Sequence, residues 1–344
     1  MTLKTTHEKI LVTGGTGLVG SHLLFNLVSG GSKVRALKRE SSSLELIKKV
    51  FSYYSDEADA LLSLIEWVDG DVTDIYSLYD AMDNIEQVYH TAAMVSFNPS
   101  DRKIMTKINV EGTANVVNAG LNKKIKKLCH VSSIATLGRA DNEELIDEET
   151  HWKNSKNNSS YSVSKYGAER EVWRGIIEGL PAVIVNPSVI IGPGNWNKGS
   201  SLLFKQVWDG LKYFTAGVNG YVDVRDVAKS MILLMESDIT NSGFILSSEN
   251  IDYLKLFSLI ADGLGKNKPS IKANSILSQL VWRMEKLRSF FTGKNPLITK
   301  ETARTAFHKY YYSNEKIKKT LSFEFIPMGV SIKETCRLFL KDHS

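Results

Sequence analysis

Lys9-Ile-Leu-Val-Thr-Gly-Gly-Thr-Gly-Leu-Val-Gly20 is the stretch of sequence that decides the fold. The apolar run up to Thr13 predicts a buried strand, and apolar residues at helical spacing from Leu18 to Ser29 predict a helix. A strand that passes through a glycine-rich turn directly into a helix is the first unit of a parallel sheet covered by helices.

The three glycines of this turn, Gly14, Gly17 and Gly20, have the spacing GxxGxxG rather than GxGxxG. Glycine lets the backbone turn tightly and approach a pyrophosphate with no side chain between them. The N–H groups and the positive dipole end of the following helix then face the anion. The turn therefore predicts a dinucleotide site, and glycines needed only for close packing of strand on helix are the alternative.

The first half of the chain continues the same alternation of strand and helix. Further strands are predicted at 33–37, 65–68, 87–91, 127–132 and 182–186, with helical segments at 41–64, 100–121 and 161–178. A polar stretch at 141–160 is predicted to be a long loop. The fold class is therefore α/β, a doubly wound Rossmann-type parallel sheet with a smaller, mainly helical C-terminal substrate lobe.

The pattern changes after Pro187, where Gly192-Pro-Gly194 interrupts the chain. Residues 221–228 are expected to lead into a helix that runs to Met235. We assign 1–187 with 221–248 to an NAD(P)-binding Rossmann domain, and 188–220 with 249–344 to a substrate-binding lobe. Residues 275–291 have an apolar helical face, which predicts a helix packed on that lobe or, alternatively, a lid or membrane-surface helix serving a lipophilic substrate.

Composition excludes several classes of protein. The 344 residues are 42% hydrophobic and carry a formal net charge of +5, with cations spread along the chain. The densest basic run, Lys123–Lys127, precedes a predicted strand, so we expect no nucleic-acid partner. Cys129 and Cys336 have no metal-ligand spacing, and we expect no metal. No membrane span or signal peptide is predicted, and we expect a cytoplasmic protein.

Tyr161 and Lys165 are four residues apart, so on a helix both side chains emerge on one face. A phenol with an ordinary pKa of about 10 is a poor base at neutral pH, and a neighbouring ammonium stabilises its phenolate. A protonated Tyr161 can equally donate to a developing alkoxide. Ser132 and Ser133 end a predicted strand, where one hydroxyl could hold the substrate oxygen or simply cap a helix.

The second strand is predicted to end near Lys38 and Arg39. An acidic side chain at this place binds the ribose 2′-hydroxyl of NAD, whereas arginine suits the 2′-phosphate of NADP. Two cations therefore favour NADP as the cofactor and leave NAD as the alternative.

Taken together, these residues resemble the extended short-chain dehydrogenase/reductase superfamily, of the NAD(P)-dependent epimerase/dehydratase type. The motifs that carry the resemblance are the glycine turn, Gly70-Asp-Val72, His90-Thr-Ala-Ala93, Asn109-Val-Glu-Gly-Thr-Ala-Asn-Val116, Val131-Ser-Ser-Ile-Ala135, Tyr161–Lys165, Asn186-Pro-Ser-Val-Ile-Ile-Gly-Pro193 and Tyr221–Ala228. They cover nearly the whole chain.

The resemblance implies a catalytic set of Ser133, Tyr161 and Lys165, with Asn109 supporting a proton relay. It places the dinucleotide against Gly14, Thr16, Gly17, Leu18, Val19, Gly20, Lys38, Arg39, Asp71, Val72, Thr91, Ala92, Ala93, Tyr161, Lys165, Pro187 and Val189. The resemblance also implies a homodimer whose interface is formed by the helices around 100–121 and 161–178.

Within the superfamily, the dihydroflavonol-reductase and 3β-hydroxysteroid-dehydrogenase-like branch matches best. Many sugar-nucleotide epimerases have the pattern RPxNxxGP where this chain has Asn186 and Val189, so two polar contacts to a diphosphate are missing. We therefore favour an NADP(H)-dependent oxidoreductase acting at a ketone or secondary alcohol of a small, fairly apolar substrate. A sugar-nucleotide epimerase or dehydratase with tightly bound NAD, and a non-catalytic dinucleotide-binding regulator, are the alternatives.

Overall fold

The computed structural model describes residues 9–138, 144–155, 158–274, 282–283 and 305–343. Except for Trp282 and Arg283, the amphipathic stretch 275–291 lies outside the described residues.

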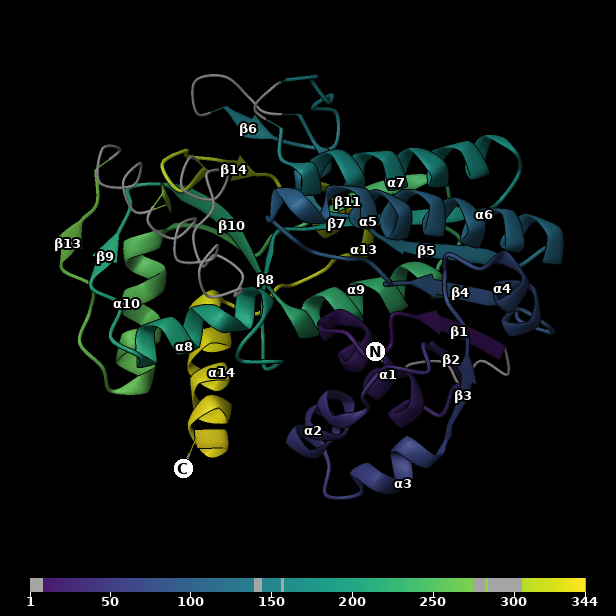
Figure 1. Ribbon diagram of the computed structural model, residues 1–344, viewed down its shortest axis with the longest axis horizontal. Helices are drawn as coiled ribbons and strands as arrows, with labels where there is room; N and C mark the ends of the chain where they lie inside the picture. The colour runs from purple at the N-terminus through teal and green to yellow at the C-terminus, as the bar shows by residue number, and fades with distance from the viewer. Residues whose placement is uncertain (1–8, 139–143, 156–157, 275–281, 284–304, 344) are drawn as a thin grey trace.

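A seven-stranded parallel sheet forms the centre of the fold, in the order β11-β7-β5-β4-β1-β2-β3 (Figure 1). Its strands are β1 (Lys9–Thr13), β2 (Lys33–Lys38), β3 (Ile65–Asp69), β4 (Gln87–His90), β5 (Lys127–Val131), β7 (Ala182–Pro187) and β11 (Ser242–Leu246). The strand order reverses between β1 and β4, so the carboxyl ends of these two strands form the topological switch point at which such sheets bind ligands. The predicted doubly wound fold is confirmed.

Helices cover both faces of this sheet (Figure 1). One face carries α1 (Leu18–Ser29), α2 (Glu45–Tyr54) and α9 (Val224–Glu236), and the other carries α4 (Ile75–Ala81), α6 (Gly112–Lys123) and α7 (Ser160–Ile177). Successive side chains of a strand point to opposite faces, so Ile10 joins one buried core and Leu11 the other. The short helix α3 (Ala58–Ser63) follows α2.

A third apolar core lies beyond the carboxyl end of the sheet, in the part of the molecule that holds the C-terminus (Figure 1). It is formed by a three-stranded sheet of β8 (Val189–Ile191), β10 (Val218–Asp223) and β12 (Glu249–Asp252), together with α8 (Leu202–Trp208), α10 (Tyr253–Leu264) and α14 (Met328–His343). The remaining elements are β6 (Leu145–Ile146) paired with β14 (Tyr311–Tyr312), β9 (Tyr213–Phe214) paired with β13 (Ile271–Lys272), and α13 (Glu315–Leu321).

Several predicted boundaries differ from the observed ones. Residues 221–223 end strand β10, and helix α9 begins only at Val224 because the Asp223 carboxylate caps it by accepting from the Arg225 N–H. The segment 41–64 divides into two helices at Ser55, which has extended backbone. The helix predicted at 100–121 consists of α5 (Arg102–Thr106), a π-helical turn at Lys107–Glu111 and α6. Strand β5 ends at Val131 rather than Ser132.

Candidate active site

The glycine turn joins β1 to α1 at the switch point. Gly14 has a φ of +72°, and a Cβ there would lie 2.5 Å from the Ala92 backbone nitrogen. A Cβ at Gly20 would lie 2.2 Å from the Gly14 carbonyl oxygen. Close packing within the protein therefore accounts for these two glycines. Gly17 is exposed, and a Cβ there would meet only the Gly14 oxygen, at 3.3 Å, so Gly17 is the glycine that faces outward.

The first turn of α1 is open to an anion. Its N-cap is Gly17, which provides no side-chain cap, and the first turn contains no acidic residue. The first N–H groups of a helix have no partner within it, so those at the start of α1 can bind a pyrophosphate. Leu18 and Val19 are half-buried here, and Thr16 lies beside them in the turn.

Lys38 and Arg39, the two predicted phosphate-binding cations, lie at the end of β2 in different surroundings. The Lys38 ammonium forms an ion pair with Asp69 at the end of the neighbouring strand. Arg39 is exposed, and within the described residues its guanidinium has no ion-pair partner. Arg39 is therefore the cation available to a 2′-phosphate. Arg35 is structural, because it is buried and its guanidinium binds Glu66 and the carbonyl oxygens of Ala81 and Asp83.

The other predicted cofactor residues follow strand ends at the same edge. Asp71 is half-buried and accepts two hydrogen bonds from Thr73, whereas Val72 is buried against Gly112 of α6. After β4, the Thr91 hydroxyl donates to the Thr13 carbonyl, and Ala92 and Ala93 stay partly accessible. Pro187 is buried at the end of β7, and Val189 is half-buried at the start of β8. Val72 and Pro187 are thus the least accessible of the set.

Tyr161 and Lys165 lie in the first turns of α7, whose N-terminus is capped by Ser159. Burial raises the pKa of the Tyr161 phenol, and a hydrogen bond with the Ser133 side chain acts in the opposite direction. Burial also lowers the pKa of Lys165 to about 8. The Lys165 ammonium is anchored by donating to the Val131 carbonyl oxygen at 2.8 Å. The structure thus brings Ser133, Tyr161 and Lys165 together.

The two adjacent serines point in different directions. Ser133 faces Tyr161 and also caps a 3₁₀ turn, Ile134–Thr136, by accepting from the Ala135 N–H. The Ser132 hydroxyl donates instead to the carboxylate of Glu169 on α7. Ser133 is therefore the serine that contacts the phenol, and the same side chain also caps the 3₁₀ turn.

Asn109 lies in the π-helical turn and is buried. Its side-chain amide donates to the Ser164 hydroxyl and exchanges two hydrogen bonds with the backbone of Met94. Asn109 therefore fixes the chain after β4 next to α7, and its side chain is bonded to neither Tyr161 nor Lys165. A π-helical turn often occurs at a functional site.

Our sequence analysis missed Glu169, and it assigned no structural role to Asn186. The Glu169 carboxylate accepts hydrogen bonds from Ser132, Thr136 and Asn186 directly beneath the Ser133 turn. One signal for Glu169 was present in the sequence, because it lies four residues after Lys165 and therefore on the same helical face.

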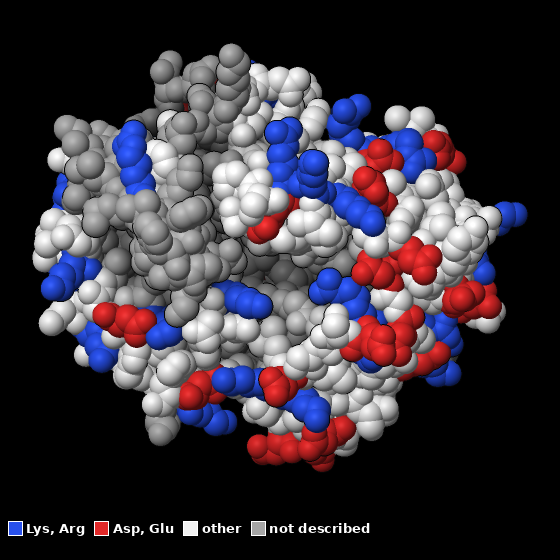
Figure 2. Space-filling model, in the orientation of Figure 1, with Lys and Arg blue, Asp and Glu red and all other residues white. Residues whose placement is uncertain are grey.

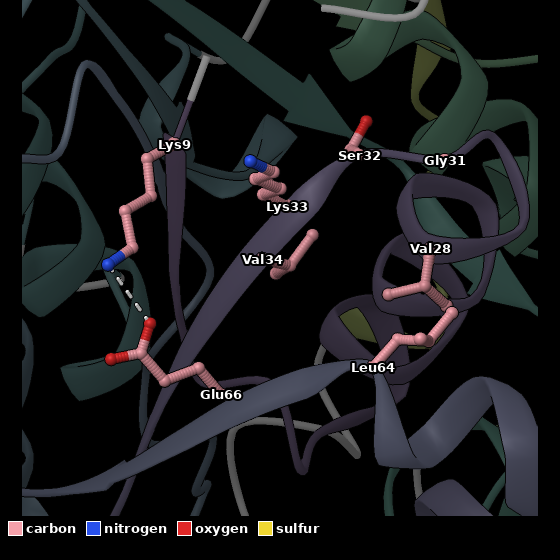
Figure 3. Close-up of a pocket in the computed structure, with 8 residues that line it drawn as sticks. All are labelled: Lys9, Val28, Gly31, Ser32, Lys33, Val34, Leu64 and Glu66. Carbon is pink, nitrogen blue, oxygen red and sulfur yellow. Dashed lines mark ion pairs between the residues drawn. The ribbon is translucent and has the colours of Figure 1, made fainter. Parts of the chain in front are cut away.

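A separate pocket of about 340 Å³ lies at the opposite edge of the main sheet (Figure 3). Its lining residues are Lys9, Val28, Gly31, Ser32, Lys33, Val34, Leu64 and Glu66, and Lys9 pairs with Glu66 at 3.2 Å. This pocket is formed at the amino ends of β1 and β2, so it is remote from the glycine turn and the Tyr161 side chain. We do not assign it to the active site.

On the face shown in Figure 2, basic and acidic side chains are interspersed. The described residues contain no cluster of three or more His, Cys, Asp or Glu side chains that could hold a metal ion. None of their helices has the length and apolar character that crossing a bilayer requires.

A doubly wound sheet with this glycine turn defines the class of Rossmann-type dinucleotide-fold proteins. The chain belongs to the NAD dependent epimerase/dehydratase family, which it matches over residues 10–244. This confirms the resemblance to extended short-chain dehydrogenases/reductases.

The chain is also similar to curated relatives, and its fold is similar to that of a solved structure. The chain is 28% identical to sterol demethylase protein B of Methylococcus capsulatus, over 83% of this chain and 84% of that one. It is 24% identical to a 3-beta-hydroxysteroid dehydrogenase of Mycolicibacterium neoaurum, over 94% and 88%. The fold matches the crystal structure of UDP-glucose 4-epimerase from Thermotoga maritima with a TM-score of 0.76, at 20% identity and over 98% and 100% of the two chains.

Proposed function

We propose that this protein is an NADP(H)-dependent reductase or dehydrogenase that acts at a ketone or secondary-alcohol carbon of a small, fairly apolar substrate. The observation that carries the proposal is the meeting of Ser133 with the Tyr161 phenol, one helical turn from the buried Lys165 ammonium. The relative named as a 3-beta-hydroxysteroid dehydrogenase supports the reaction class.

The residues at the switch point fit a nicotinamide dinucleotide. The uncapped N-terminus of α1 and the outward-facing Gly17 suit its pyrophosphate, and Arg39 suits a 2′-phosphate. When bound, the cofactor supplies the hydride donor or acceptor of the reaction.

Tyr161 handles the proton. Because burial raises its pKa, the phenol is protonated at neutral pH and can donate to the oxygen of a carbonyl undergoing reduction. Ser133 holds the same oxygen through its hydroxyl. The Lys165 ammonium stabilises the phenolate that remains, and Tyr161 regains its proton from solvent before the next turnover.

The surroundings of Tyr161 favour an apolar substrate. Phe97 contacts the Tyr161 ring edge-on, with centroids 5.7 Å apart, and Phe97 and nearby Val95 are both exposed. Asn186 is buried with its amide turned toward Glu169 and Thr136, so it is not oriented to bind a substrate diphosphate. Val189 has no side-chain donor. These features support a reductase over a sugar-nucleotide epimerase.

Tyr161→Phe tests the proposal. We expect this variant to retain NADPH binding and to lose roughly 10²- to 10⁴-fold in kcat for ketone reduction, because the proton donor is gone. NADPH oxidation against a panel of apolar cyclic and aryl ketones provides the assay. Full activity of the variant would show that the proposed chemistry is wrong.

The nucleotide released from freshly purified protein by denaturation distinguishes the two enzyme classes. We expect an empty site or a small amount of NADP, as for a cofactor that exchanges at every turnover. Near-stoichiometric NAD, identified by mass spectrometry, would instead favour an epimerase or dehydratase that regenerates its bound cofactor.

A further inference from the structure

Glu169 is the centre of a polar network that the proposed reaction does not use directly. Its Oε2 atom accepts from the hydroxyls of Ser132 and Thr136 and from the Asn186 amide, the last two at 2.7 and 2.8 Å. Ser132 directly follows β5, Thr136 belongs to the following 3₁₀ turn and Asn186 belongs to β7, and all three are buried. An acceptor that meets three donors at one oxygen is suited to the ionised carboxylate.

This network encloses the turn that carries Ser133. The Asn186 amide nitrogen lies 3.3 Å from the Ser133 carbonyl oxygen and 3.0 Å from the Thr136 hydroxyl oxygen. The Thr136 hydroxyl oxygen lies 2.8 Å from the same Ser133 carbonyl oxygen. The side chains of Ser132 and Thr136, on either side of Ser133, are thereby bound to one carboxylate on α7. Because Tyr161 is on the same helix, Glu169 links the position of the serine to that of the phenol.

We propose that Glu169 is a positioning residue for Ser133, Tyr161 and Lys165: its carboxylate fixes the Ser133 turn against α7 and places a negative charge one helical turn from the Lys165 ammonium. This inference rests on the proposed function. Glu169 touches neither Tyr161 nor the reacting atoms, so it acts through the groups that it holds.

The charges around Lys165 make the electrostatic part of this role measurable. Glu169 raises the pKa of Lys165 against the stronger, lowering effect of burial. From the sheet, His130 on β5 and His90 on β4 face the same ammonium, and burial holds their pKa values far below neutrality. On α7 itself, burial raises the pKa of Tyr161. Among Lys165, the two histidines and Tyr161, Lys165 is therefore the group that changes its charge between pH 6 and 9, because its pKa is about 8.

Glu169→Gln keeps the shape of the side chain and its acceptor oxygen but removes the charge. We expect kcat for ketone reduction to fall roughly 10- to 100-fold while the Kd for NADPH is unchanged. We also expect the decline of activity near pH 8 in the wild type to move down by roughly one pH unit, because Lys165 loses its protonated form more easily. The measurements are pH profiles of kcat and fluorescence titration with NADPH.

Glu171→Gln is the matched control, since it removes the same charge from the same helix. Glu171 pairs with Arg174 and lies away from Ser133, so both kcat and the pH profile should stay at wild-type values. If Glu169→Gln does not fold, Thr136→Val replaces it and removes the hydroxyl that joins the Ser133 turn to the carboxylate. For Thr136→Val we expect a fall in kcat without a change in NADPH binding.

The outcomes separate this inference from the proposed function. Suppose that Tyr161→Phe is inactive. The positioning role is then overturned if Glu169→Gln keeps the wild-type kcat and pH profile, or if Thr136→Val keeps the wild-type kcat. An active Tyr161→Phe would instead overturn the proposed function, whatever Glu169→Gln shows.

Discussion

At the scale of single residues, burial moves the pKa values of Tyr161 and Lys165 in opposite directions. The phenol is harder to ionise than in water, and the ammonium, with a pKa of about 8, is easier to neutralise. At pH 7 the phenol is protonated and the ammonium is charged. This is the state that the proposed reduction requires, so we expect reduction to be fastest below pH 8.

We propose that the choice between NADP and NAD depends on Arg39. We expect Arg39→Ala to raise the KM for NADPH roughly 10- to 100-fold, through loss of charge-assisted hydrogen bonds, with little change in the KM for NADH. Lys38→Ala should have a smaller effect, because Lys38 is already paired with Asp69. Steady-state kinetics with both cofactors provide the check. An equal effect of Arg39→Ala on NADH and NADPH would contradict a 2′-phosphate site.

At the scale of elements, one carboxylate joins the C-terminal helix α14 to α2, a helix packed on the main sheet. Asp342 on α14 accepts from the Tyr53 hydroxyl, from the Trp196 indole at 2.6 Å and from Lys49 at 2.7 Å. Burial acts to raise its pKa, but these three donors hold the pKa of Asp342 below its usual value. Tyr53 and Lys49 belong to α2, so this contact connects helices that are far apart in sequence.

We expect Asp342→Ala to lower the free energy of unfolding by about 2–4 kcal/mol, because it leaves three donors without their shared acceptor. Asp209→Ala is the control. Asp209 is 54% exposed and pairs with Lys205 one turn away, so its loss should change stability by less than about 0.5 kcal/mol. Urea denaturation followed by circular dichroism measures both. Equal stability of the two variants would show that the α14–α2 contact contributes little.

At the scale of the whole molecule, three buried histidines link folding to pH. Burial lowers the pKa of His22 to about 4 and that of His90 to about 3, and it also lowers the pKa of His130 well below 6.5. The unfolded chain binds protons at these sites near pH 6.5. The folded form is thus favoured above pH 6.5 and loses stability as pH falls. Asp226, whose pKa burial raises to about 6, partly offsets this loss.

We expect the free energy of unfolding to fall by about 3 kcal/mol between pH 7 and pH 5.5, since each histidine contributes about 1.4 kcal/mol per pH unit below 6.5. His22→Asn should remove about one third of this dependence, whereas substitution of the exposed His151 should leave it unchanged. Urea denaturation at several pH values measures the slope. Stability that does not change over this range would mean that the histidines are accessible to protons in the folded state.

The sequence by itself determined six of the seven strands of the main sheet, the glycine turn and the separation of Tyr161 from Lys165, because strand and helix periodicity and turn chemistry are local properties of the chain. Strand β11 was not predicted. Only the tertiary structure decided that Ser133 faces the phenol and that Ser132 faces Glu169. It likewise decided that Asn186 turns away from the open site, that Lys38 is paired and that Arg39 is exposed. These outcomes depend on how α7 packs on β5 and β7 and how β2 aligns with β3. Such contacts join residues 17 to 53 positions apart, and their geometry follows from the packing of whole elements rather than from any local pattern.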